Sequence, residues 1–409
     1  MHLRFTTLLA ILLSIVCGVF LGVIAHQRLG SSGTPELDLP AFEAALRRVQ
    51  RNYVEPLSDT ELFESALNGL MDRLDPHSQY LNAAAVDALE VETTGRFGGI
   101  GIELGVSQGQ FTVVSPLDGT PAARAGVQAG DQLLAIDDQP LRRQRLAEVI
   151  DRMRGEPGSE VALKLRRAGA EFKLELVRET ISIDSVSHRW LEPGIAYLRI
   201  RQFQSDTGYE FRRAIRRLQR DHEQSGSPTA VRGLILDLRN NPGGVLQASV
   251  TVADALLSEG LIVTTRGRLP SSRSRYRAAG RDLLDGAPVI ALINGGSASA
   301  AEIVAGALKD HQRATLIGER SYGKGSVQTL VSLGDQRAVK LTTAYYLTPN
   351  GESIHQRGIA PDISFADDGT INDFDTALLE EAVYRIRQTI ADATKRHEDG
   401  SELLARQPE

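Results

Sequence analysis

Residues 233–244 read GLILDLRNNPGG, an almost unbroken apolar run that ends in a polar turn with two glycines. A strand this apolar is expected where both faces of a sheet are covered, as in the parallel sheets of α/β proteins. Two further runs share the pattern, PVIALIN at 288–294 and ATLIG at 314–318. Helical periods separate the three, over residues 245–257 and 300–309. This alternation predicts a parallel sheet with right-handed crossovers.

The segments before this core predict two other kinds of structure. Residues 41–54 and 59–74 carry apolar side chains three and four positions apart, which predicts two amphipathic helices. Residues 97–180 combine short apolar runs with Gly and Asp turns, which predicts a small, mostly β module. Its expected strands are 111–114, 132–136 and 161–165, with one helix at 146–154.

The last third of the chain is expected to complete the core. Residues 327–333 and 338–346 alternate around Gly334-Asp335 and predict a hairpin, and 376–396 predict a long helix. The fold class is therefore α+β and multidomain. It consists of an α/β core that begins near residue 195, an inserted mostly β module, and helical segments at both ends.

Composition excludes several classes of protein. The net charge is 46 − 52 = −6 and is spread along the chain, which argues against the basic face of a nucleic-acid binder. The single cysteine, Cys17, allows neither an intramolecular disulfide nor a cysteine-based zinc site. A length of 409 residues gives a soft expectation of two or three domains.

An apolar segment, residues 8–25, follows His2 and Arg4 near the N-terminus. Its length is close to the minimum for a membrane-spanning helix and long for the core of a signal peptide. We therefore expect residues 1–30 to be a signal peptide or a membrane anchor. The rest of the chain is then exported, either to the periplasm or anchored on the extracytoplasmic side of a membrane. Lipidation at Cys17 is disfavoured because the preceding Val16 is bulky.

Three expected strand ends carry glycine-rich turns: 239–244 (RNNPGG), 294–300 (NGGSASA) and 318–325 (GERSYGKG). Ligands and reacting atoms gather at the carboxyl ends of strands in such sheets. The third turn nearly matches a phosphate-binding loop. However, Gly325 stands where Ser or Thr is needed, and a strand rather than a helix is expected after it. A nucleotide site is therefore not expected.

Ser299 stands at the start of an expected helix, in the pattern Ser299-Ala300-Ala301-Glu302. One interpretation is a capping box, in which Ser299 only caps the helix. The other is a nucleophile beside unpaired N–H groups that could hold a developing oxyanion. Those donors would be the N–H of Ala300 and one from Gly243 or Gly244.

Lys324 is the candidate base for that hydroxyl. Only six of the 46 basic residues are lysine, so a lysine in this glycine turn is unusual. A lysine acts as a base only when it is neutral, and burial can depress its pKa, whereas arginine stays charged. The alternative is a solvated loop charge. Gln328 could orient the amine. The histidines outside the termini and polar runs follow no glycine turn of this kind; they are His77, His188, His311 and His355.

These residues resemble the carboxy-terminal processing peptidases, also called tail-specific proteases, over about residues 41–365. The resemblance rests on long motifs in the family's order. They are LDPHSQYL (74–81), DLRNNPGG (237–244), GSASA (296–300), GKGSVQ (323–328) and GIAPD (358–362).

The resemblance implies a serine–lysine dyad in a crotonase-like α/β core with an inserted PDZ domain. It implies that Ser299 is the nucleophile, that Lys324 is the general base and that Gln328 positions Lys324. Ser297, the motif's other serine, is then not the nucleophile.

The resemblance also implies an oxyanion hole made by the N–H groups of Gly243 and Ala300, with Gly244 the weaker candidate. Ala301 departs from relatives that often have a further serine there, without consequence for the dyad. Asp75 and His77 are interpreted as turn and cap residues.

The β module fits the PDZ interpretation. Gly99-Ile100-Gly101-Ile102 resembles the loop whose N–H groups hold a peptide's terminal carboxylate, while the peptide adds as a strand to the sheet edge. The expected organisation is a signal peptide or anchor (1–30), a linker and helical region (31–94), a PDZ domain (95–172), a serine protease core (173–370) and a C-terminal helix and tail (371–409).

The sequence therefore favours an exported endopeptidase that captures the C-terminal tail of a protein substrate and cleaves it through an acyl-enzyme at Ser299. No metal or nucleotide cofactor is implied. The expected partners are protein substrates. Three further partners are left open: an activating adaptor protein, a second copy of the chain, and a membrane contacted through an uncleaved N-terminal segment. Two alternatives remain, a catalytically inactive PDZ adaptor and a small-molecule esterase or amidase.

Overall fold

The computed structural model describes residues 38–107, 109–141, 144–224, 231–365 and 373–405. The apolar segment 8–25 lies outside them, and with it Cys17. Among the helices of the described residues, none is long and apolar enough to cross a membrane. The chain divides after Arg73 into two compact units.

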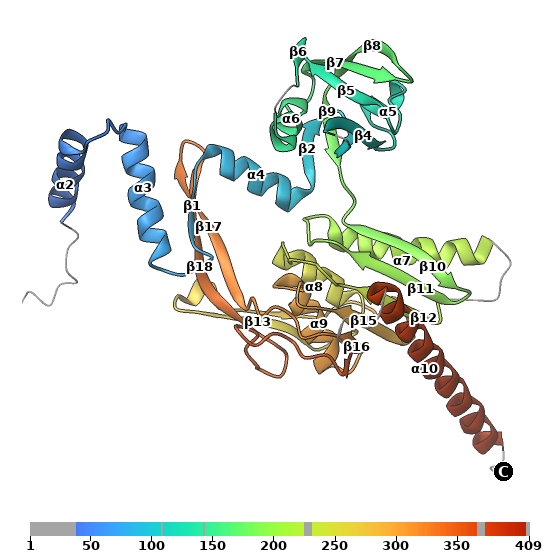
Figure 1. Ribbon diagram of the computed structural model, residues 1–409. Coiled ribbons are helices and arrows are strands. Elements are labelled where there is room, and N and C mark those ends of the chain that lie inside the picture. The colour runs from blue at the N-terminus through green and yellow to red at the C-terminus, as the bar shows by residue number, and fades with distance from the viewer. Residues whose placement is uncertain (1–37, 108, 142–143, 225–230, 366–372, 406–409) are drawn as a thin grey trace, which may run out of the picture. The chain divides into compact units, whose positions relative to one another are not determined.

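The first unit contains two helices, α2 (Leu39–Asn52) and α3 (Asp59–Asp72) (Figure 1). Both were predicted, and their ends agree within two residues. Asp38 caps α2, and Ser58 with Glu61 forms a reciprocal capping box at the start of α3. Local capping chemistry therefore fixes where each helix begins.

The second unit is built on a six-stranded sheet with the order β10-β11-β12-β15-β16-β19. Its pairs from β11 to β19 are all parallel, and β10 adds an antiparallel edge. The three predicted core strands are confirmed as β12, β15 and β16. The bounds are β10 (Val186–Glu192), β11 (Ile195–Ile200), β12 (Gly233–Asp237), β15 (Val289–Ile293), β16 (Ala314–Gly318) and β19 (Ile363–Ser364).

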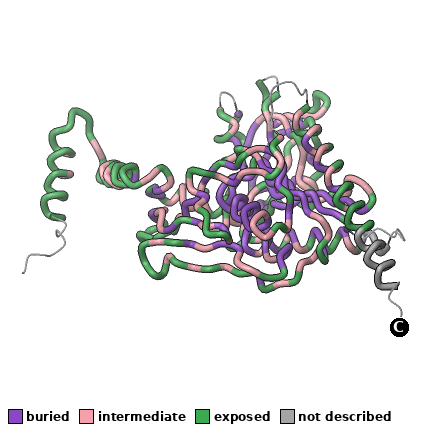
Figure 2. The backbone as a smooth tube through the Cα atoms, turned by 90° about the horizontal axis from the view of Figure 1, so that it is seen from below, coloured by how far each residue is buried: buried purple, intermediate pink, exposed green. Residues whose placement is uncertain are grey.

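Helices cover both faces of this sheet, which explains its unbroken apolar strands. Leu234 and Leu236 of β12 pack in a cluster with side chains of α7 (Thr207–Gln224), α8 (Leu246–Asp254) and α9 (Ala300–Asp310). The intervening Ile235 packs instead with α10 (Phe374–Ala405). Buried residues concentrate in these strands and in α9 (Figure 2). Helix α7 was not predicted from the sequence.

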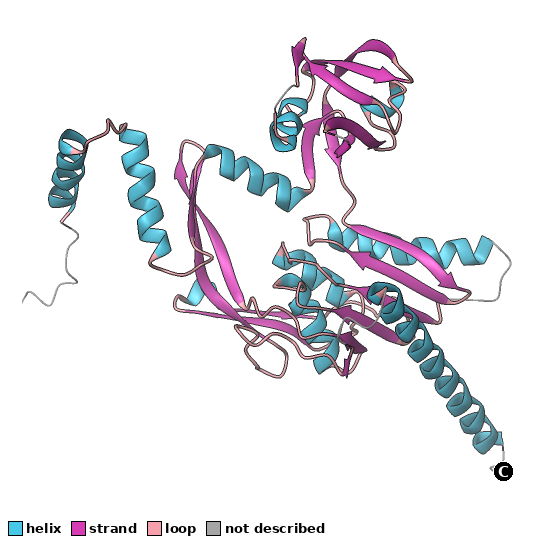
Figure 3. Ribbon diagram, viewed as in Figure 1, coloured by secondary structure: helices cyan, strands magenta, loops and turns pink. Residues whose placement is uncertain are grey.

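A second sheet has the order β1-β18-β13-β14, with β17 also paired to β18 (Figure 3). The predicted hairpin is confirmed as β17 and β18. Helix α4 follows β1 and was not predicted. The bounds are β1 (Gln79–Leu81), α4 (Ala83–Thr94), β13 (Leu261–Gly267), β14 (Ser274–Arg277), β17 (Ser326–Gly334) and β18 (Arg337–Leu347).

The predicted β module has its own sheet, ordered β3-β4-β5-β7-β8, and its own apolar core. Strand β8 pairs with β7 over its whole length, so strand pairing carries the module beyond residue 172, where the sequence placed its end. The bounds are β2 (Arg96–Gly99), β3 (Ile102–Ser107), β4 (Gln110–Pro116), α5 (Pro121–Arg124), β5 (Gln132–Ile136), β6 (Gln139–Pro140), α6 (Leu146–Met153), β7 (Glu160–Arg167), β8 (Ala170–Val177) and β9 (Glu179–Ser182).

A buried ion pair holds the carboxyl end of β12. The Arg239 guanidinium donates Nε and Nη2 hydrogen bonds to the two carboxylate oxygens of Asp237, at 2.9 and 2.7 Å. The Tyr197 hydroxyl donates to the same carboxylate, and Arg239 also reaches Asp375 on α10. The charged residues of this motif are therefore structural, and they join the sheet to the helix that covers it.

Replacing Asp237 with Asn should lower the free energy of unfolding by about 3 kcal/mol, because it leaves the Arg239 guanidinium buried without its charge partner. Urea denaturation measures this. The matched control is Asp335→Asn, which breaks the exposed pair with Arg337 and should change stability by less than about 0.5 kcal/mol. Equal effects of the two substitutions would contradict the structural role assigned to Asp237.

Candidate active site

The predicted glycine turns meet at one cavity of about 410 Å³ at the strand ends. Ser299, Lys324, Gln328 and Gly244 all line it. The α/β topology thus brings together residues 55 to 84 positions away from Gly244 in the chain. Gly243 is not among the lining residues.

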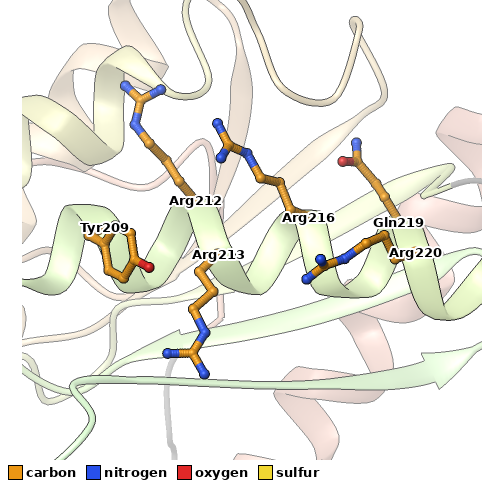
Figure 4. A pocket seen from close by; sticks show the side chains of 6 residues that line it. All are labelled: Tyr209, Arg212, Arg213, Arg216, Gln219 and Arg220. Carbon is orange, nitrogen blue, oxygen red and sulfur yellow. The ribbon is translucent and has the colours of Figure 1, made fainter.

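A larger cavity, about 580 Å³, lies along α7 and carries no comparable chemistry. Figure 4 shows its lining, four arginines with Tyr209 and Gln219. Guanidinium groups stay protonated and cannot serve as a base. The candidate nucleophile Ser299 and the candidate base Lys324 both line the smaller cavity, which is therefore the candidate active site.

The backbone of Ser299 is held in an unusual conformation, with φ = 53° and ψ = −112°. A non-glycine residue in such a region costs about 1–3 kcal/mol and persists only where its surroundings impose it. Ser299 forms a capping box with Glu302, whose Oε2 accepts the Ser299 N–H at 2.7 Å. The Ser299 hydroxyl also interacts with that of the buried Tyr346. The cap interpretation and the nucleophile interpretation of Ser299 therefore both stay open.

The other half of the box, Glu302, is fully buried and joins two of the turns. Its Oε2 accepts hydrogen bonds from the N–H groups of Ser299 and Lys324, at 2.7 and 2.9 Å. Its Oε1 accepts from the Ser321 hydroxyl and the Gly323 N–H. Burial raises the pKa of the Glu302 carboxyl, although these four donors favour its charged form. One carboxylate therefore fixes the backbone of both candidate reactive residues.

Lys324 lies in a setting that favours its neutral form. Burial lowers the pKa of the Lys324 amine, and the positive charge of Lys340 on β18 lowers it further. The negative charges of Glu92 and Glu302 oppose this and raise the pKa, but they do not reverse its direction. The alternative of an ordinary solvated loop charge does not fit this environment.

The structure separates the two candidate glycines of the oxyanion hole. Gly243 is buried, and its N–H donates to Oδ1 of Asn241 at 2.9 Å. Gly244 is exposed to the cavity, and within the described residues no acceptor is recorded for its N–H. The same holds for the N–H of Ala300 at the start of α9. Within the described residues, Gly244 is therefore the candidate donor that lines the cavity, and Ala300 is buried next to Ser299, which also lines it.

Other residues of these turns have structural partners. Asn240 and Asn294 exchange hydrogen bonds, linking the turns after β12 and β15. The Ser297 hydroxyl donates to the carbonyl of Leu238 at 2.8 Å. The turn that resembled a phosphate-binding loop runs into strand β17, as predicted, and not into a helix.

Gln328 lines the cavity with Lys324, and its amide nitrogen donates to Ser326 Oγ at 2.9 Å and to Thr342 Oγ1 at 3.4 Å. Asp75 caps the turn before β1, accepting from the N–H groups of His77 and Ser78. The turn role predicted for Asp75 is therefore confirmed.

Several residues of the cavity were missed by the sequence analysis. Leu89, Glu92 and Thr93 come from α4, and Lys340 and Tyr346 from β18. Asn82, which caps α4 by accepting from Ala85 N–H, was an available signal for that helix. The pKa of His77 is lowered by burial and by the charge of Lys324, which places this histidine near the site.

The β module carries a separate cavity of about 510 Å³. The predicted residues Gly99, Ile100, Gly101 and Ile102 all line it, together with side chains of α6 and Arg154. Gly101 has φ = +76°, and a Cβ there would lie 2.4 Å from the Thr120 side chain, so glycine is required.

Comparison with known proteins shows what these two sites belong to. Residues 194–365 match peptidase family S41, and residues 112–167 match the PDZ domain. A carboxy-terminal-processing protease of Bartonella bacilliformis is 44% identical over 356 residues, covering 85% of this chain and 81% of that protein. The chain belongs to peptidase family S41.

Other members of family S41 agree. A carboxyl-terminal-processing protease of Synechocystis sp. is 38% identical over 336 residues, covering 78% of this chain and 76% of its own length. The structure of a photosystem II D1 C-terminal processing protease is 30% identical, with a TM-score of 0.46, and covers 82% of this chain and 94% of that one. The two family matches and the two sequence relatives make the protein a serine-type peptidase of the carboxy-terminal processing group with a PDZ domain.

In this S41 peptidase, Glu302→Gln should lower both stability and activity. In this variant one carboxylate oxygen of Glu302 is replaced by an NH₂ group, which is a donor and cannot accept from the N–H groups that face it. Each buried hydrogen bond that is lost costs about 1–3 kcal/mol. Urea denaturation and the rate of fluorophosphonate labelling measure the two effects. Glu352→Gln, at an exposed position, is the control and should change neither. Full activity in Glu302→Gln would show that the carboxylate does not hold the site.

Proposed function

We propose that this peptidase cuts protein tails with Ser299 as the nucleophile and neutral Lys324 as its general base. One observation carries the proposal: both side chains line the same cavity at the strand ends, and burial there lowers the pKa of the amine. A lysine made neutral by desolvation can take the proton of an adjacent hydroxyl, which is the requirement for a serine nucleophile.

In the proposed reaction, Ser299 Oγ attacks the carbonyl carbon of the scissile peptide while its proton passes to Lys324 Nζ. The carbonyl oxygen becomes an oxyanion held by N–H donors. When the tetrahedral intermediate collapses, the C–N bond breaks and Lys324 returns the proton to the leaving amine. Water then attacks the acyl-enzyme with the same base, releasing the shortened carboxylate product and restoring Ser299.

We assign the oxyanion hole to the N–H groups of Gly244 and Ala300. This reverses the order of preference that the family resemblance implied, since the N–H of Gly243 already donates to Asn241. Gly243 contributes close packing instead, because a Cβ there would lie 2.7 Å from Ser299 Cβ.

The PDZ domain is proposed to bind the substrate's C-terminal residues in its own cavity. The backbone at Gly99–Ile102 would hold the terminal carboxylate, and the cation of Arg154, which also lines the cavity, favours that charge. Capture of a tail there would raise the local concentration of the same chain at Ser299.

Some finer features stay predictions. They are the crotonase-like classification of the core, export to the periplasm or the extracytoplasmic side of a membrane, and association with an adaptor, a second copy or a membrane. The alternative of an inactive PDZ adaptor is disfavoured because every position of the proposed machinery is filled. The small-molecule esterase or amidase is disfavoured by the PDZ domain.

Ser299→Ala should abolish cleavage of a tailed protein while tail binding persists. Lys324→Arg should lower the rate of fluorophosphonate labelling by about 10²–10⁴-fold, because a guanidinium cannot accept the proton. Tail binding by the two variants is the control for folding. Cleavage that survives in Ser299→Ala would mean that the nucleophile is another residue.

The rate of acylation should rise with pH as Lys324 loses its proton. Since burial lowers the pKa of this amine, the rise should begin below the pH expected for an ordinary lysine. Labelling rates between pH 5 and 9, with wild-type protein under conditions where chemistry limits the rate, measure the profile. A flat profile across that range would contradict a neutral-amine base.

A peptide with a free C-terminal carboxylate should bind at least about tenfold more tightly than the same peptide with a C-terminal amide. The reason is that the amide peptide cannot form the charge-assisted hydrogen bonds that a carboxylate accepts from the backbone N–H groups. Isothermal titration of the Ser299→Ala variant compares the two peptides without cleavage. Equal affinities would contradict carboxylate capture by the PDZ domain but would leave the proposed dyad untouched.

A further inference from the structure

Asp75 makes one contact that its role in the turn does not require. Besides capping the turn before β1, its Oδ1 lies 3.0 Å from the hydroxyl of Thr342 on β18. Its Oδ2 accepts from the Ser78 hydroxyl, which in turn accepts from the Thr342 N–H. Asp75 is thus joined to Thr342 by two routes, although 267 positions separate them in the chain.

The direction of the Thr342 hydrogen bond is fixed by chemistry. Burial opposes the charge of Asp75, but hydrogen bonds from Ser78, His77 and Thr342 outweigh it and lower the pKa of the carboxyl. An ionised carboxylate can only accept hydrogen bonds. The Thr342 hydroxyl must therefore donate its proton to Asp75, which leaves its oxygen free to accept.

The same reasoning fixes the orientation of Gln328. Gln328 and Thr342 are cross-strand partners in the β17–β18 hairpin, and the Gln328 amide faces Thr342 Oγ1 at 3.4 Å. Since that oxygen is left as an acceptor, the amide must turn its NH₂ group toward it. The nitrogen also donates to Ser326 Oγ. The carbonyl oxygen Oε1 then lies on the other edge of the planar amide, where Ser326 and Thr342 do not occupy it, and Gln328 lines the same cavity as Lys324.

We propose that Asp75 is a positioning residue for the peptidase reaction, acting through Thr342 to hold the Gln328 carbonyl toward Lys324. This inference rests on the proposed role of Lys324 as the base and on the positioning role that the family resemblance implies for Gln328. In that role Oε1 accepts an N–H of the neutral amine, which turns the nitrogen lone pair toward Ser299. It also accepts from the ammonium that forms when the proton is transferred. A flipped amide would present N–H groups to a cation.

The test separates this relay from the turn-capping role of Asp75. The measured quantity is the second-order rate constant for fluorophosphonate labelling of Ser299 in the full chain. Thr342→Val removes the hydroxyl but keeps the side-chain shape, and we expect about tenfold slower labelling. Thr342→Ser restores the hydroxyl and should recover the wild-type rate within about threefold.

A double-mutant cycle isolates the coupling. Asp75→Ala alone should also slow labelling by about tenfold. In the Thr342→Val background the same change should add less than about threefold, because the relay is already broken. A loss from turn distortion alone would persist in full in that background. Additive effects of the two substitutions would therefore overturn the inference.

The pH profile supplies a readout that a purely structural role would not move. Thr342→Val alters no formal charge, and the neighbouring titratable groups Asp75, Lys340, Glu92, Glu302, His77 and His355 all remain. If the Gln328 carbonyl no longer accepts from the Lys324 ammonium, the charged form of Lys324 is disfavoured and its pKa falls. The rise of the labelling rate with pH should then shift to lower pH, and the maximal rate at high pH should fall. A lower maximal rate without that shift would count against the relay.

Gln328→Ala distinguishes failure of the inference from failure of the proposed function. If that variant labels at the wild-type rate, Gln328 has no role in the reaction and the relay fails, whereas the proposed function fails only if Ser299→Ala or Lys324→Arg keeps full activity. If Gln328→Ala is slow but the cycle is additive, the proposed function stands and only the relay from Asp75 is wrong.

Discussion

The active site depends on one buried carboxylate. Glu302 accepts four hydrogen bonds, and the donors come from the turn that holds Ser299 and the turn that holds Lys324. Each turn has little regular structure of its own, so neither could hold a side chain accurately by local interactions. A charged acceptor inside the protein makes these hydrogen bonds strong and makes any vacancy among them costly. These four hydrogen bonds offset the cost of burying the carboxylate, and they fix the positions of the two turns relative to each other.

Rigidity at these turns has a consequence for the chemistry. Ser299 sits in a strained backbone conformation at the start of α9, and such strain survives only because the surrounding structure imposes it. Lys324 is held where burial opposes its charge. The strained Ser299 backbone and the buried Lys324 amine both destabilise the folded protein. The apolar clusters between the sheet and the helices on its two faces stabilise it.

Much of this could be predicted from the sequence. The strands 233–238, 288–294 and 314–318 were identifiable because burial on both faces leaves an unbroken apolar run, and α9 was identifiable from its helical period. Helices α4 and α7 were missed. In α7, arginines project from several sides of the helix (Figure 4), and the apolar buried residues are Phe211, Ala214, Ile215 and Leu218. Strand β8 was not expected from the sequence because its residues alternate with partly exposed ones and its apolar signal is weak.

The sequence by itself determined which groups are candidates for the chemistry, because a hydroxyl at a helix start and a rare lysine in a glycine turn are local facts. Only the tertiary structure decided which partner each group has. The N–H of Gly243 is taken by Asn241, that of Gly244 is not, and Asp75 reaches Thr342 across most of the chain. Hydrogen bonds depend on distances of a few tenths of an ångström between segments remote in sequence, and such distances are set by the packing of the whole sheet.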